Sequence, residues 1–370
     1  MVENSLPLSR VVAHVPRHDL RRMLRLVRLL FRLSQSFSYR QQVFPQLPEV
    51  ARYDPGHASL MMGYDFHLTP SGPRLIEVNT NAGGGYLAWL SEQQTGKIST
   101  ISLSQRYETR LLDSYLREWQ DFSASNNPLK TIALLDEEPQ SQPLFPEMLA
   151  CCDWLCGQGF DAQVVSPQQL DVRPDGVYCC TKKIDLIYNR HCDFFLETDV
   201  MADLRTAYLT GKVCLSPNPF TYGLLADKRR MILWSDPQAL DSLDLKVKDQ
   251  DLLLAMVPHS FLFSDRHPDE LWEQRKNYIF KPVTRFGSRG VLMGKSISRN
   301  RFAALEPATT LVQKVVLPSI EQDQTGREFK VDLRLFVYRD HLLGLGARLY
   351  QGQVTNLQTE GGGFAPVRIV

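Results

Sequence analysis

The sequence predicts a mixed α/β (α+β) fold, and three patterns of apolar and polar residues support that prediction. Residues 61–81 alternate on either side of a turn, residues 130–188 alternate short strands with a helical pattern, and residues 310–348 contain apolar strands. The first pattern is typical of a β-hairpin, and the second of a small domain with a parallel sheet. With 370 residues, the chain has room for two or three domains.

The composition excludes several classes of protein. The chain is 43% hydrophobic and 22% charged with a net charge of +1, so it has no overall attraction to nucleic acid or an anionic membrane. Its seven cysteines lack the paired spacing of a zinc site, which favours a reducing compartment. No run approaches the roughly 18 apolar residues that span a bilayer, and no signal peptide is evident. We expect a cytoplasmic protein without nucleic-acid or membrane partners.

Residues 16–34 predict a basic amphipathic helix. Leu20, Met23, Val27 and Leu30 follow helical spacing, and arginines occupy the other faces. Such a helix could bind nucleic acid or a membrane surface, or it could pack on a core with its arginines in solvent. We favour packing, because the rest of the chain adds nothing to a basic field.

The hairpin at 61–81 places three oxygen-bearing side chains together. Two-residue periodicity puts Glu77 and Asn79 on one face, and Asp65 on the partner strand can reach that face. Carboxylate and amide oxygens suit Mg²⁺, and the glycines at 83–85 would let the backbone approach a ligand. The alternative is a solvated polar face beside a flexible loop.

The middle of the chain predicts a small parallel sheet. A helix at 105–122 ends before a polar run at 123–128, which we interpret as a domain boundary. The strands that follow are expected at 130–135, 160–165, 176–180 and 184–188, with a helix at 144–159. Ligands of parallel sheets bind at the carboxyl ends of strands, so Asn189 and Arg190 are candidate substrate contacts. They could equally belong to a loop that binds the backbone.

The last part of the chain contains a candidate phosphate site. Residues 217–230 lead into a helix that carries Lys228, and a strand at 277–282 carries Lys281. A Gly-rich loop at 286–290 follows, and backbone N–H groups of such loops can bind phosphate oxygens. An ordinary glycine hairpin is the alternative.

Two arginines stand in strands that otherwise have the pattern of a core. Arg334 lies in the predicted strand 329–338 and Arg348 in the predicted strand 341–348, after an apolar strand at 310–318. Buried arginines need partners, commonly carboxylate or phosphate.

The order of Asp65, Glu77-Val-Asn79 and a small-residue loop resembles the metal-binding strand pair of the ATP-grasp ligases, a family that includes glutathione synthetase. Residues 217–370 also resemble this fold in order and content, and the match continues from the N-terminus. The resemblance therefore implies a circularly permuted ATP-grasp fold. Its parts would be 1–122, which completes the C-lobe; 123–216, a Rossmann-like pre-ATP-grasp domain; and 217–370, the nucleotide-binding lobe and the start of the C-lobe.

The resemblance also implies roles for single residues. The residues that resemble phosphate-binding positions are Lys228 and Lys281, and those of the flap over the phosphates are Gly287, Ser288, Arg289 and Gly290. The hinge that reads adenine corresponds to Gln313, Lys314, Val315 and Val316. The ribose-binding acid would be Glu321 or, alternatively, Asp323. Those for metal and chemistry are Asp65, Glu77 and Asn79 as Mg²⁺ ligands, with Arg334, Arg348 and Asn356 as catalytic residues. Gly361 and Gly362 resemble the loop that closes on the intermediate, and the full set of candidate substrate contacts is Asn81, Asn189, Arg190, Gly361 and Gly362.

The activity that this resemblance implies is an ATP- and Mg²⁺-dependent carboxylate–amine ligase, which forms an amide through an acyl phosphate. Its partners would be small-molecule carboxylates and amines, and a homodimer is compatible with the sequence. Two alternatives stay open: a phosphotransferase that uses the same nucleotide site, and a non-catalytic nucleotide-binding protein.

Overall fold

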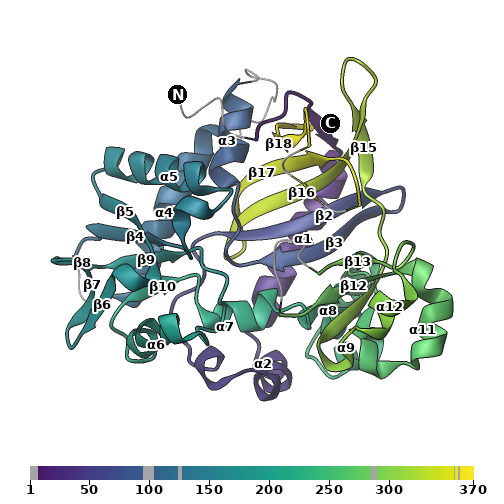
Figure 1. Ribbon diagram of the computed structural model, residues 1–370, viewed down its shortest axis with the longest axis horizontal. Coiled ribbons are helices and arrows are strands. Elements are labelled where there is room, and N and C mark those ends of the chain that lie inside the picture. The colour runs from purple at the N-terminus through teal and green to yellow at the C-terminus, as the bar shows by residue number, and fades with distance from the viewer. Residues whose placement is uncertain (1–6, 95–103, 124–126, 285–289, 354, 357–358) are drawn as a thin grey trace.

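One large antiparallel sheet combines strands from both ends of the chain (Figure 1). The computed structural model describes residues 7–94, 104–123, 127–284, 290–353, 355–356 and 359–370. In this sheet the strands follow the order β18 (Gly363–Ala365), β17 (His341–Tyr350), β16 (Glu328–Tyr338), β2 (Met62–Thr69) and β3 (Gly72–Asn79), and β15 (Ser319–Gln322) pairs with β16. The hairpin predicted at 61–81 is therefore present, and its first strand lies against β16.

The two faces of this sheet are set by the alternation along β16. Leu333, Leu335 and Val337 belong to the core that includes helix α1 (Arg17–Ser34). Phe336 points the other way, into a core shared with α3 (Gly85–Gln94) and α4 (Ser104–Phe122). Because side chains alternate along a strand, Asp332 and Arg334 share the face of Phe336.

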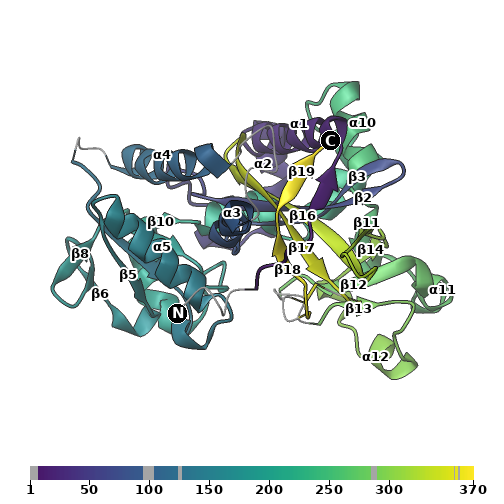
Figure 2. The ribbon, with the colours of Figure 1, turned by 90° about the horizontal axis from the view of Figure 1, so that it is seen from above.

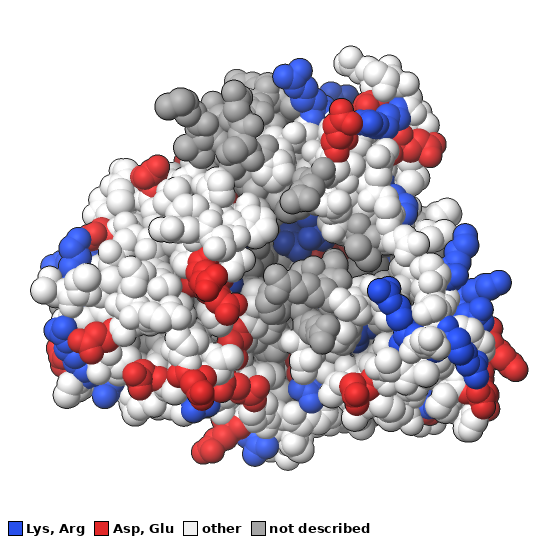
Figure 3. Space-filling model, in the orientation of Figure 1, with Lys and Arg blue, Asp and Glu red and all other residues white. Residues whose placement is uncertain are grey.

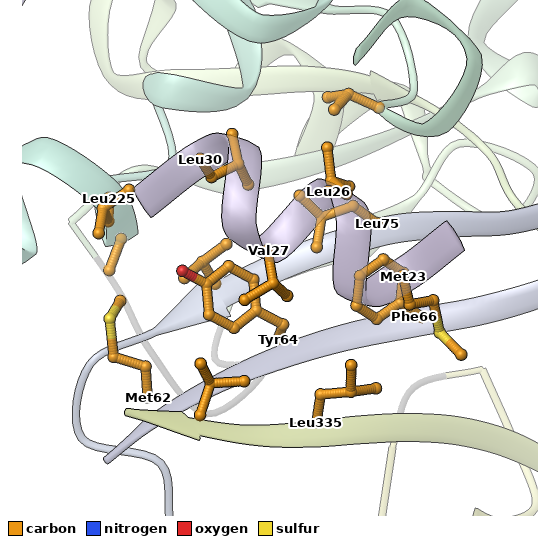
Figure 4. Packing of buried hydrophobic residues seen from close by; sticks show 14 of the residues in the cluster. Met23, Leu26, Val27, Leu30, Met62, Tyr64, Phe66, Leu75, Leu225 and Leu335 are labelled. Carbon is orange, nitrogen blue, oxygen red and sulfur yellow. The ribbon is translucent and has the colours of Figure 1, made fainter. Parts of the chain in front are cut away.

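Helix α1 packs as expected for an amphipathic helix on a core. Met23, Leu26, Val27 and Leu30 are buried, and Figure 4 shows Val27 beside Tyr64 and Met23 beside Phe66 of the hairpin. The exposed arginines lie on its other faces, at positions 21, 25, 28 and 32. The interpretation of this helix as a packed element is confirmed.

A four-stranded parallel sheet lies on one side of the central sheet (Figures 1 and 2). Its order is β10 (Cys214–Ser216), β9 (Leu186–Asn189), β4 (Thr131–Leu135) and β5 (Asp161–Val165), with α5 (Phe145–Gly157) packed on it. The strand expected at 176–180 is not part of it, which corrects the prediction. Instead β7 (Gly176–Cys179) forms a separate antiparallel sheet with β6 (Leu170–Arg173) and β8 (Lys182–Ile184), because tight turns join these strands.

A third group of strands lies on the other side of the central sheet (Figure 2). Its antiparallel order is β11 (Ser260–Leu262), β14 (Thr310–Lys314), β12 (Tyr278–Pro282) and β13 (Leu292–Met293). The remaining helices are α2 (Phe37–Val43), α6 (Ala202–Leu209), α7 (Pro219–Thr221), the π-helix η7 (Tyr222–Ala226), α8 (Arg230–Ser235), α9 (Pro237–Asp241), α10 (Val247–Met256), α11 (Pro268–Gln274) and α12 (Arg299–Ala303). Lys228 was expected within a helix, but it lies in the turn between η7 and α8.

The two ends of the described chain lie side by side. Strand β1 (Ala13–Val15) pairs in parallel with β19 (Val367–Ile369), with Ala13 opposite Val367. Among the described helices, none combines the length and apolar character needed to cross a bilayer.

Replacing Phe66 by Ala tests whether the hairpin is part of the main core. Phe66 is fully buried at the centre of β2, so Phe66→Ala should lower the free energy of unfolding by about 3–5 kcal/mol. Urea titration measures this change. Phe37→Ala is the matched control, because Phe37 is 75% exposed and its loss should change stability very little. Equal effects of the two substitutions would contradict the packing described above.

Candidate active site

A cavity opens between the hairpin, strands β12, β14, β16 and β17, and the segment around η7, with an empty volume of about 1210 Å³ including solvent at its mouth. Eleven of the residues selected from the sequence line it: Asp65, Glu77, Asn79, Asn81, Lys228, Lys281, Gln313, Lys314, Val315, Val316 and Arg348. Figure 3 shows the molecule hollowed near its centre, with lysine or arginine atoms visible inside the hollow. The cavity therefore joins residues from distant parts of the chain.

The three candidate metal ligands are neighbours across the hairpin. Asp65 lies opposite Glu77 in the strand register, and Gly63 lies opposite Asn79. The Asn79 Nδ2 donates to Glu77 Oε1 at 3.3 Å and to Asp65 Oδ2 at 3.4 Å. The Asn79 amide oxygen and the carboxylate of Glu77 are ligands of the kind that Mg²⁺ prefers.

Asp65 is the centre of a buried ion cluster. Arg334 binds both of its oxygens, with Nε–Oδ1 at 2.6 Å and Nη2–Oδ2 at 2.7 Å, and the Arg348 Nη2 donates to Oδ2 at 2.8 Å. Burial alone would raise the pKa of the Asp65 carboxyl, but the charges of Arg334 and Arg348 hold that pKa well below its usual range. These bonds engage both carboxylate oxygens, so the carboxylate of Asp65 orients the two arginines.

Glu77 and Asn79 alone would supply few protein ligands to a metal ion. In the described part of the chain, no cluster of three or more His, Cys, Asp or Glu side chains is arranged to hold a metal ion. Glu77 and Asn79 would therefore hold Mg²⁺ together with phosphate oxygens and water, which is common for this ion.

A second group of charged and polar side chains, Asp332, Arg348 and His67, lies on the same face of the sheet. Asp332 lies opposite Arg348 in the register, and its Oδ2 accepts from Arg348 Nη2 at 3.3 Å. The His67 ring bonds Asp332 Oδ1 through Nε2 at 2.6 Å and the Val316 carbonyl through Nδ1 at 2.8 Å. A carbonyl only accepts, and hydrogen bonds and the Arg348 charge lower the pKa of the Asp332 carboxyl against the opposing effect of burial. The His67 ring therefore links the Val316 carbonyl to Asp332 on β16.

Lys281 lines the same cavity from strand β12. Its Nζ donates to Gln313 Oε1 at 2.7 Å and to the Ile76 carbonyl at 3.2 Å. Burial lowers the pKa of Lys281 to about 8, with a further lowering by Lys228 and an opposing effect of Glu77. Lys281 and Glu77 thus lie close enough to interact.

The glycine loop after β3 is fixed by the parallel-sheet part. The buried Glu147 carboxylate accepts from the Gly84 N–H at 2.8 Å and from Arg190 Nη1 at 3.4 Å. A Cβ at Gly83 would lie 2.6 Å from Arg190 Nη2, and one at Gly84, whose φ is +90°, would lie 1.9 Å from Phe364. Only glycine allows this close approach.

Several residues selected from the sequence do not line the cavity. The Arg334 guanidinium is bound to the carboxylate of Asp65, and the Arg190 guanidinium contacts the glycine loop at Gly83. The Asn189 side-chain oxygen accepts a hydrogen bond from the His191 N–H. Glu321 instead accepts from the backbone and ring of His14, at 2.9 and 3.1 Å. Gly290, Asn356, Gly361 and Gly362 are also absent from the lining. Gly287, Ser288 and Arg289 lie outside the described residues.

Three important residues were missed in the sequence. His67 could have been found, because it follows Asp65 by two positions in the same strand. Asp332 is likewise two positions from Arg334, on the same face. Glu147 gave no signal, because it lies in a helix whose contact with the glycine loop is purely tertiary.

Removing the charge of Asp65 should be costly even without any ligand. Asp65→Asn removes the anion that pairs with the buried Arg334 and one of the two anions that pair with Arg348, so the free energy of unfolding should fall by about 3–5 kcal/mol, as measured by urea titration. Asp171→Asn is the control, because Asp171 pairs with Arg173 at the surface and should contribute less than about 1 kcal/mol. A loss at Asp65 as small as in the control would show that the buried cluster is not stabilising.

The comparisons with known proteins support the fold. No protein-family model and no curated protein matches the sequence. Among solved structures, a glutathione synthetase-like effector from Globodera pallida matches with a TM-score of 0.63 at 10% identity, over 98% of this chain and 90% of that one.

Two weaker similarities carry no further conclusion. The first, to a protein of Methylobacillus flagellatus named as a candidate gamma-glutamylcysteine synthetase, has a TM-score of 0.48 at 11% identity, over 94% of this chain and 87% of that one. The second, to the ATP-grasp ligase PsnB, has a TM-score of 0.33 at 13% identity, over 66% of this chain and 88% of that one. The fold of the chain is thus similar to that of a glutathione synthetase-like protein, in agreement with the mixed helix-and-sheet fold expected from the sequence.

Proposed function

We propose that this protein is an ATP- and Mg²⁺-dependent carboxylate–amine ligase, which forms an amide through an acyl phosphate. One observation carries the proposal: Glu77, Asn79, Lys228, Lys281 and Arg348 converge on one cavity although they come from opposite ends of the chain. The likeness to the glutathione synthetase-like effector supports the fold on which such a site is built.

The nucleotide would bind along the wall formed by β12 and β14. Lys228 and Lys281 would bind its phosphates, and the backbone of the segment 313–316 would contact adenine. His67 keeps Val316 in place through its bond to the Val316 carbonyl. Mg²⁺, held by Glu77 and Asn79, would supply positive charge to the phosphate oxygens.

Arg348 would stabilise charge on the transferred phosphoryl group. Its Nη2 donates to both Asp65 and Asp332, at 2.8 and 3.3 Å, which fixes the guanidinium in the cavity wall. The substrate carboxylate would accept the phosphoryl group and release ADP, and an amine would then displace phosphate to give the amide. Arg334 acts through Asp65 in this scheme and is a positioning residue.

We extend the proposal to the chain's organisation. The pairing of β2 with β16, and of β1 with β19, supports a circular permutation in which residues 1–122 complete the C-lobe. The parallel sheet supports a pre-ATP-grasp domain at 123–216, with the nucleotide-binding lobe at 217–370.

ADP release tests the proposal. Purified protein with Mg²⁺ and ATP is screened against amino acids and peptides, and the products are identified by mass spectrometry. An amide together with ADP and phosphate supports a ligase, whereas a phosphorylated product would identify a phosphotransferase. Absence of Mg²⁺-dependent ATP binding would instead favour a protein that does not use this nucleotide.

Glu77→Gln should abolish turnover without affecting the fold. It removes a metal-binding charge at a partly exposed position, so kcat/KM should fall by roughly a hundredfold or more while the thermal midpoint stays unchanged. Glu273→Gln, at an exposed position on α11, is the control. Wild-type turnover of Glu77→Gln would remove Glu77 from the site.

The affinity for ATP should depend on the charge of Lys281. Its pKa of about 8 means that the ammonium loses its proton above that pH, so ATP binding should weaken between pH 7.5 and 9.5, by at most about tenfold per pH unit. Lys281→Arg keeps its charge throughout this range and should flatten the dependence, as measured by calorimetry. Parallel pH profiles for the two proteins would contradict the assignment of Lys281 to the phosphates.

A further inference from the structure

We infer that one of the two substrates carries an uncharged apolar or aromatic side chain, which lies against Phe194 and Tyr222, and that acidic side chains are disfavoured there. This inference rests on the proposed function and names the substrate class of the same site. It follows from the charge distribution of the cavity, from the geometry of an aromatic pair, and from the position of Arg190.

The charged residues of the cavity come from the strands and from the turn at Lys228. The cations there include Lys281 and Arg348, and the acids include Glu77 and Asp332. The described residues that line the rest of the cavity near η7 are neutral, and we call them the neutral wall: Thr80, Asn81, Phe194, Tyr222 and Ala226. A ligand that reaches the neutral wall therefore meets no cation within it.

The neutral wall contains a fixed aromatic surface. The rings of Phe194 and Tyr222 are stacked with centroids 4.2 Å apart and an angle of 9° between their planes. Phe195 holds Tyr222 from the side, at 5.0 Å and 81°. Burial raises the pKa of Tyr222, so its hydroxyl stays neutral. A preformed aromatic surface of this kind binds apolar and planar groups at little ordering cost.

Arg190, the nearby arginine of the segment before Phe194, is not available to this wall. Its guanidinium is buried, bonds Glu147 at 3.4 Å, and lies against Gly83. The Asn81 amide is also engaged, because it donates to the Arg190 carbonyl at 3.2 Å. Arg229, the other arginine close to Tyr222, is bound by Asp227. An acidic side chain placed on the neutral wall would therefore lose its hydration and find both nearby guanidinium groups already paired, which is unfavourable.

The test compares matched amino acids that each carry both a carboxylate and an amine. L-phenylalanine and L-leucine are compared with L-aspartate and L-glutamate in two assays: ADP release with Mg²⁺ and ATP, and the ligand-induced shift of the thermal midpoint. The apolar pair should give a kcat/KM about tenfold or more above the acidic pair, and the larger thermal shift.

Substitution of Phe194 assigns this preference to the wall. Phe194→Ala should lower kcat/KM for L-phenylalanine about tenfold while the KM for ATP stays unchanged. Phe194→Leu, which keeps an apolar side chain and guards against misfolding, should retain activity with L-leucine but lose part of it with L-phenylalanine. Phe37→Ala, at an exposed position, should behave as wild type.

The two proposals fail in different ways. If the protein uses ATP but prefers the acidic amino acids, or if both Phe194 variants leave the preference unchanged, the neutral-wall inference is overturned and the ligase proposal stands. If Mg²⁺-ATP does not bind, the ligase proposal fails. The inference about the neutral wall is then decided by whether the apolar amino acids raise the thermal midpoint more than the acidic ones do. If no apolar probe raises the thermal midpoint or supports ADP release, the inference is overturned.

Discussion

The buried carboxylate of Asp65 is the interaction on which the rest of the structure depends. It accepts three short hydrogen bonds from Arg334 and Arg348, at 2.6, 2.7 and 2.8 Å, and its side chain is 2% exposed. Two guanidinium groups cannot be buried there without an anion, because desolvation would exceed any gain. The three charges therefore fix β2, β16 and β17 relative to one another, although β2 lies far from the other two in sequence.

This fixed register determines what the cavity contains. With Asp65 opposite Arg334, Glu77 and Asn79 follow on the next strand and open into the cavity. A shift of the β2–β16 register by one residue would turn these side chains into the core beneath α1. The His67 ring extends the same row to the Val316 carbonyl, so this sheet face also positions the segment that follows β14.

Local patterns predicted much of the fold and of the site, because the decisive residues alternate along strands. The hairpin, helix α1 and the strands with Arg334 and Arg348 followed from two- or four-residue periodicity, and Lys281 from its place before a Gly-rich loop. What the sequence could not reveal depends on tertiary contact. Glu147 reaches the glycine loop from a distant helix, Glu321 turns to His14, and β7 joins an antiparallel sheet rather than the parallel one. The pairing of Asp65 with two arginines also depends on tertiary contact, because Arg334 and Arg348 come from strands far along the chain.

A crystal structure with Mg²⁺ and a non-hydrolysable ATP analogue tests the central claim most directly, namely that both ends of the chain build one magnesium–nucleotide site. We expect the metal on Glu77 and Asn79, the phosphates between it and Lys281, and the Asp65 carboxylate still bound to Arg334 and Arg348. A nucleotide bound away from Lys281, or a metal that displaces the arginines from Asp65, would contradict this account.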